Sequence, residues 1–136
     1  MPVLLDKFYH VLDENRGYGI LLLRLLIGWR LVDGTLDNVL SWERMLEFSR
    51  FLDQFGFPFA LASANVSVYA QFICGILYML GWFIRPAAAV MIVNFLVALV
   101  MVHAGTTFQQ SFEALVMFTT AIFFLLNGPG KFALGK

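Results

Sequence analysis

The sequence predicts an all-α membrane protein, built as a bundle of four transmembrane helices with an amphipathic helix between the first two. Two long runs without a charged residue, Phe59–Ile84 and Ala87–Phe112, are separated only by Arg85 and Pro86. Each run exceeds the roughly 20 apolar residues that a helix needs to cross a bilayer. The composition agrees, since 60% of the residues are hydrophobic and 13% are charged, against about 25% charged in soluble domains.

One integral membrane domain is expected over residues 1–136, with spans at about 17–40, 60–83, 86–103 and 106–126. Arg85 and Pro86 should form a tight turn at the membrane surface between the two middle spans. The run Asn127–Gly130 contains Gly128 and Pro129 and should end the last span, because glycine and proline terminate helices.

The segment of about 41–55 between the first two spans has the pattern of an amphipathic helix. Its apolar residues recur at helical spacing, and its charged residues fill the other face: Glu43, Arg44, Glu47, Arg50 and Asp53. Such a helix lies on the membrane surface or covers the mouth of the bundle. The alternative is a plain connecting helix.

Basic residues in the short loops predict the orientation of the bundle, because cytoplasmic loops carry an excess of lysine and arginine. One side of the predicted bundle carries Lys7, Arg16, Arg85, Lys131 and Lys136. The opposite side carries only Arg44 and Arg50, diluted by acidic residues. Both termini are therefore expected in the cytoplasm.

Polar side chains within the spans are the best functional candidates, because charge inside lipid is costly. Depths counted along each span at roughly 1.5 Å per residue place five of them in the outer half: Arg30, Asp33, Gln71, His103 and Glu113. We predict that these five form an outward-facing, ligand-binding pocket above an inner polar layer of Arg24 and Asn94. Alternatively, they form a neutralised structural network in which Arg30 bonds Asp33 or Glu113, and Arg24 extends to the cytoplasmic surface.

Several chemistries are disfavoured by the residue inventory. The chain has no histidine or cysteine cluster with metal-ligand spacing, so no metal site is expected. Only His10 and His103 are present, which argues against bis-histidine haem, and the single Cys74 excludes an intramolecular disulfide. The net charge of zero indicates no nucleic-acid partner. A pocket of this kind could instead hold a quinone, a lipid headgroup or a small acid.

Four stretches together resemble the DoxX family of small bacterial four-helix membrane proteins: Leu22–Gly34, Phe55–Pro58, Gln71–Ala88 and Gly128–Lys131. The resemblance runs from about Gly19 to Lys131 and implies a multi-pass protein of the bacterial inner (cytoplasmic) membrane. It also implies a link to quinone reduction or to oxidative-stress complexes, as in some relatives. Arg24 matches the family's arginine of the first span. Gln71 stands where many relatives have glutamate, and Asp33 stands where a histidine often occurs.

Two functions remain open from the sequence. The first is a quinone-linked redox subunit in which Arg30, His103 and Glu113 hold the quinone, with electrons supplied by a redox partner protein. The alternative is a non-enzymatic membrane module that binds lipid or docks partner proteins. Membrane lipids are expected partners in both, and a homo-oligomer is compatible with either.

Overall fold

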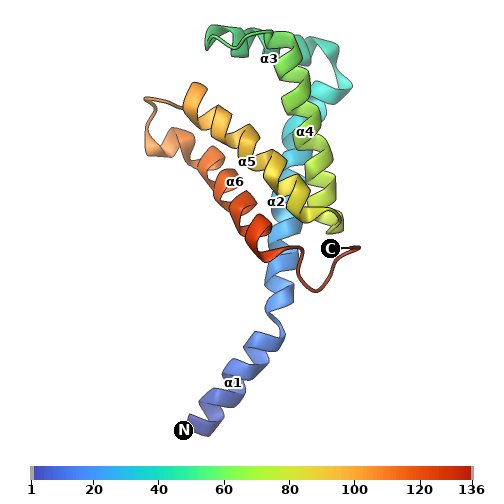
Figure 1. Cartoon of the computed structure of the whole chain (residues 1–136), viewed down its shortest axis with the longest axis vertical. Coiled ribbons are helices and arrows are strands. Elements are labelled where there is room, and N and C mark those ends of the chain that lie inside the picture. Colours follow the sequence, from blue (N-terminus) through green and yellow to red (C-terminus); the bar gives the residue numbers. More distant parts are fainter. Residues whose placement is uncertain (1, 136) are drawn as a thin grey trace.

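The structure is a computed structural model that describes residues 2–135, and this part of the chain is helical without any strand. Figure 1 shows the helices along the chain. Their bounds are α1 Pro2–Glu14, α2 Arg16–Leu40, α3 Trp42–Gln54, α4 Ala60–Leu80, α5 Ile84–Met101 and α6 Phe108–Asn127.

Among the described residues, three helices are long and apolar enough to cross a membrane, namely α4, α5 and α6. Helix α2 is longer than any of them at 25 residues. It differs in composition, because Arg24, Arg30 and Asp33 fall within one stretch of 18 residues. The all-helical fold is thus confirmed with three candidate membrane spans among the described residues, and the fourth span stays a prediction.

Helices α2 and α4 pack closely because small residues meet at their contact. A Cβ atom built on Gly28 would lie 2.6 Å from the carbonyl oxygen of Gly75, and one on Gly75 would lie 2.7 Å from that of Gly28. The two backbones therefore approach in a way that only glycine permits, a common device between membrane helices. Beside this contact, a core that includes Leu31, Tyr78 and Phe124 joins α2, α4 and α6.

The turn between α4 and α5 lies earlier than predicted. Helix α4 ends at Leu80, and the left-handed residues Gly81 (φ 71°) and Phe83 (φ 50°) reverse the chain. Arg85 and Pro86 already belong to the first turn of α5. Proline is tolerated there because the first N–H groups of a helix need no helical partner.

Helix α3 lies across the end of the bundle where α4 begins (Figure 1). Its side chains Met45 and Leu52 are buried and pack in a cluster with Ala64 and Val68 of α4. The Ser41 hydroxyl accepts a hydrogen bond from the backbone N–H of Arg44 at 3.4 Å and so helps to begin the helix.

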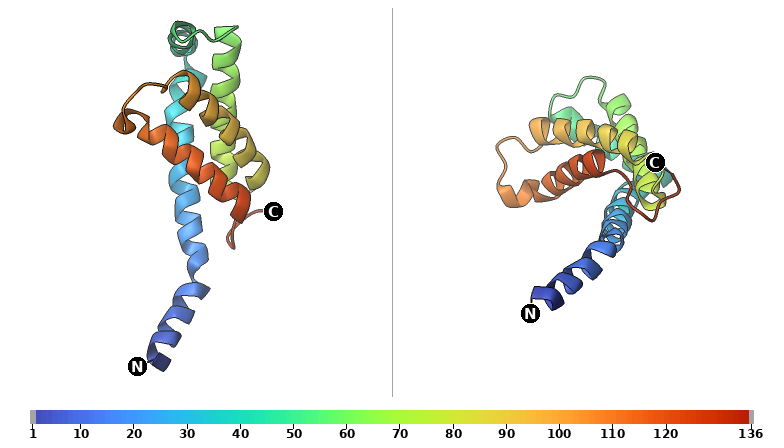
Figure 2. Two further views of the ribbon diagram at one scale, coloured as in Figure 1. Left: turned by 60° about the vertical axis from the view of Figure 1, so that its left-hand side comes forward. Right: turned by 60° about the horizontal axis from the view of Figure 1, so that its bottom comes forward.

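Helix α1 was not anticipated from the sequence. It leaves the bundle beyond the start of α2 (Figure 2), and none of its residues is buried.

The chain after α6 returns to the end of α4. The backbone N–H of Leu134 donates to the carbonyl of Leu80 at 3.1 Å, and that of Gly135 donates to Gly81 at 3.3 Å. This C-terminal segment, residues 128–135, therefore closes the end of the bundle from which α1 departs.

Candidate functional site

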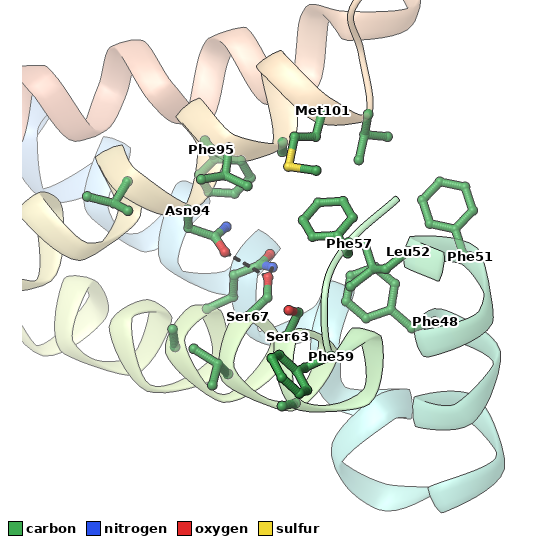
Figure 3. A pocket seen from close by; sticks show the side chains of 18 of the residues that line it. Phe48, Phe51, Leu52, Phe57, Phe59, Ser63, Ser67, Asn94, Phe95 and Met101 are labelled. Atoms are coloured by element: carbon green, nitrogen blue, oxygen red, sulfur yellow. Dashed lines mark hydrogen bonds between the residues drawn. The ribbon is translucent and has the colours of Figure 1, made fainter. Parts of the chain in front are cut away.

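A cavity of about 860 Å³ lies between α3, α4, α5 and the loop that joins α3 to α4. Figure 3 shows that aromatic side chains from separate elements surround it, with Phe48 from α3, Phe57 and Phe59 from the loop, and Phe95 from α5. Ligand pockets of this size are typically apolar with a few polar groups that orient the ligand.

A chain of hydrogen bonds crosses this apolar cavity. The amide of Gln71 donates to the hydroxyl of Ser67 at 3.0 Å, and Ser67 donates to the carbonyl oxygen of Asn94 at 2.7 Å (Figure 3). Ser67 and Gln71 lie one helical turn apart on α4, and Asn94 faces them from α5. The amide N–H groups of Asn94 have no hydrogen-bond partner within residues 2–135, so they remain available to a ligand.

His103 lines the same cavity just beyond the end of α5. Its imidazole makes no hydrogen bond or ion pair to residues 2–135, while its backbone carbonyl accepts from the Thr106 hydroxyl at 2.6 Å. His103 is the one titratable side chain among the residues that line the cavity. It lies nine residues after Asn94, which corresponds to roughly 13 Å along a helix.

Arg30 and Glu113 form an ion pair elsewhere, between α2 and α6. The Arg30 Nη2 and Glu113 Oε1 atoms are 2.6 Å apart, and the side chains are 46% and 60% exposed. This is one of the two contacts expected for Arg30. Asp33 is also exposed and has no ion-pair partner within residues 2–135.

The predicted pocket residues are therefore divided between two places. Gln71 and His103 line the cavity, whereas Arg30, Asp33 and Glu113 do not. Asn94, which we had placed in a separate inner layer, joins the cavity group instead. A role of the other three in ligand binding stays a prediction.

The depths assigned from the sequence need correction on α2. Arg24 contacts the last turn of α4, so α2 at Gly17, seven residues earlier, lies roughly 10 Å beyond the end of α4. The antiparallel contact of Gly28 with Gly75 then places Asp33 level with the middle of α4. Counting from Gly17 had placed Arg30 and Asp33 too far towards the outer surface.

Arg24 does not share a layer with Asn94. Its side chain is 1% exposed and donates to four backbone carbonyls: Tyr78 at 2.9 Å, Met79 at 3.3 Å, Pro129 at 3.0 Å, and Phe132. Because the guanidinium is enclosed by these groups, it does not extend to the surface, which was the alternative expectation.

Sequence reasoning left Ser67 and the aromatic side chains of α3 and its loop out of the proposed site. A signal for Ser67 was present, since it precedes Gln71 by one helical turn and so shares a face of the span with it. The contribution of Phe48 and Phe57 had no such signal, because it depends on how α3 folds back over α4.

The described part of the chain contains no group of three or more His, Cys, Asp or Glu side chains that could hold a metal ion.

A protein-family model described as DoxX matches residues 19–104, which is more than half of the chain. Neither a curated protein nor a solved structure matches.

Proposed function

Because the chain belongs to the DoxX family, we propose that it is a four-span protein of the bacterial inner membrane that holds a quinone-type amphiphile in the cavity between α3, α4 and α5. In this role it is a quinone-linked subunit that presents the quinone to a redox partner protein. The partner supplies the electrons, since the sequence offers one cysteine and two histidines and no motif for a redox centre.

The fourth span is α2. Its 25 residues correspond to roughly 37 Å, more than the hydrocarbon thickness of about 30 Å. Its close packing on α4 supports a shared path through the bilayer. The distribution of lysine and arginine supports cytoplasmic termini, with α3 at the outer surface.

The observation that carries the proposal is the unpaired amide of Asn94 in an apolar cavity. One hydrogen bond to such a donor contributes about 0.5–1.5 kcal/mol. A quinone carbonyl could accept the Asn94 N–H, with Gln71 and Ser67 holding the amide in orientation. The isoprenoid tail would lie along the aromatic and aliphatic lining.

Reduction of a quinone to a quinol consumes two electrons and two protons. His103 is suited to relay protons from the aqueous phase, because a neutral imidazole has one donor and one acceptor nitrogen. It lies towards the end of the cavity where α5 meets the loop that joins α5 to α6. Gln71 cannot take this part because an amide does not titrate.

A second candidate is a non-enzymatic module that holds a membrane lipid. It is favoured by the cavity lining, which has no carboxylate, lysine or arginine side chain. Acyl chains need no polar partner, and one ester carbonyl could occupy the place of the quinone oxygen at Asn94.

Mass spectrometry of co-purified small molecules tests both candidates. We expect quinone with the wild-type protein and about fivefold less with Asn94→Leu, which is the effect of about 1 kcal/mol for one hydrogen bond. Asn65→Leu is the matched control, because Asn65 bonds its own helix at Leu61 and does not line the cavity. Phospholipid in place of quinone would favour the lipid module, and equal quinone in both variants would contradict the site.

A further inference from the structure

The exposed face of α2 carries a stripe of residues spaced alternately four and three apart. The members are Leu22, Leu26, Trp29, Asp33, Leu36 and Leu40. Four of them are strongly exposed, at 67%, 66%, 55% and 75% for Leu22, Leu26, Trp29 and Leu40. A repeat of 3.5 residues is the pattern of a seam between two helices that wind around each other.

This stripe points away from the rest of the protein. The opposite face of α2 holds Arg24, Gly28 and Leu31, which pack on α4 and the core. No helix within residues 2–135 covers the stripe.

The stripe and its border carry two charged side chains, Asp33 and Arg30, that are poorly suited to contact with lipid. Asp33 lies level with the middle of α4 and has no partner within residues 2–135. The neighbouring Arg30 uses Nη2 for Glu113, but a guanidinium has five N–H donors and Arg30 is 46% exposed. Hydrocarbon cannot satisfy either group.

We propose that the protein is a homodimer in which the α2 helices of two copies pack in parallel along this stripe. Each Asp33 accepts hydrogen bonds from Arg30 of the other copy, while each Arg30 keeps its own Glu113. A single polar position in an otherwise apolar seam also fixes the register of the two helices.

A second copy fits this surface better than lipid or an unrelated helix. A twofold contact requires a patch that is complementary to itself, and this patch contains both an unpaired carboxylate and free guanidinium donors. Both copies have the same orientation in the membrane, so Arg30 of one copy lies roughly 4.5 Å along the axis from Asp33 of the other, which a long arginine side chain can span. An unrelated helix would need a basic side chain of its own at that depth.

The inference rests on α2 as a span, which is part of the proposed function, and is independent of the cavity ligand. Disulfide cross-linking of the full-length protein in native membranes tests it, with Cys74→Ser as the background. Leu26→Cys should give a disulfide-linked dimer. Ile76→Cys is the matched control, since Ile76 is 37% exposed on α4 at a similar depth, and it should stay monomeric.

The charge pair is tested by adding Asp33→Arg to the Leu26→Cys protein. This change places a second arginine against Arg30 of the other copy. The Leu26→Cys dimer should fall at least tenfold, whereas Asp53→Arg on α3 should leave it unchanged. The dimer is contradicted if Leu26→Cys cross-links no more than Ile76→Cys. It is also contradicted if native mass spectrometry finds one copy alone, or one copy bound to a different protein. If Leu26→Cys reacts with a water-soluble thiol reagent, α2 is not a span, and that premise of the proposed function fails separately.

Discussion

Arg24 is the residue on which one end of the bundle depends. Its guanidinium joins the last turn of α4, through Tyr78 and Met79, to the segment that follows α6, through Pro129 and Phe132. The last carbonyls of a helix have no helical partner and need one from elsewhere. A buried charge thus serves as a C-terminal cap and holds the chain terminus in place.

Replacing Arg24 with Gln should destabilise the protein strongly. The shorter amide cannot reach all four carbonyls, and each buried carbonyl left without a donor costs about 1–3 kcal/mol. The free energy of unfolding should therefore fall by about 3 kcal/mol or more, measured by denaturation in detergent. Arg16→Gln, at an exposed position, should change it little, and equal stability of the two variants would contradict the capping role.

The sequence predicted that Arg24 would be an unusual residue but not what it binds. A charge in a long apolar segment is conspicuous. Its partners, however, are 54 to 108 residues away in the chain, and they are backbone carbonyls that no side-chain pattern reveals.

At the scale of elements, the contact between α2 and α4 sets the arrangement of the other helices. Gly28 and Gly75 let the backbones meet, and this register determines which residues of α2 lie at each level of α4. The position of Arg24 against the end of α4 follows from it.

Substituting Gly75 with Ala should weaken this pair of helices. The added Cβ would lie 2.7 Å from the Gly28 carbonyl oxygen, so the backbones must separate and lose packing. Thermal unfolding in detergent should occur at a clearly lower temperature. In contrast, Gly19→Ala meets no atom within 4 Å and should be neutral or stabilise by up to about 1 kcal/mol through helix propensity. A Gly75→Ala protein as stable as Gly19→Ala would show that the close approach is not needed.

The elements that the sequence predicted best are those with long uniform patterns. The apolar runs predicted α4, α5 and α6, and the segment 42–54 is helical within one residue of the expectation at each end. Helix α1 was missed because it mixes charged and apolar residues and buries none of them. The turn was misplaced because Gly81 and Phe83 look like any other residues of an apolar run, whereas Arg85 and Pro86 resemble a turn.

At the scale of the whole molecule, the site was only partly predictable. Gln71 and His103 were recognised because polar groups are rare in the spans. Asn94 was assigned to another layer, and Arg30 was grouped with them, because depth was counted along each span separately. Only the packing of α2 on α4 gives a common scale of depth.

The orientation of the whole bundle can be tested by cysteine labelling in intact cells, in a Cys74→Ser background. With cytoplasmic termini, His10→Cys on α1 should resist a membrane-impermeant thiol reagent, whereas Asp53→Cys on α3 should react. Both native side chains are exposed, so burial would not explain a difference. The reverse pattern would contradict the orientation and place the cavity mouth at the cytoplasmic side.

Photolabelling with an azido-quinone is the most direct test of the central claim, that the cavity between α3, α4 and α5 binds quinone. Labelled peptides would be mapped by mass spectrometry in protein held in native membranes. We expect adducts on α4 around Ser67 and Gln71 and on α5 from Asn94 to His103, and competition by unlabelled quinone should remove them. Adducts confined to α2 and α6 around Arg30 and Glu113, or labelling that quinone does not compete, would contradict the account.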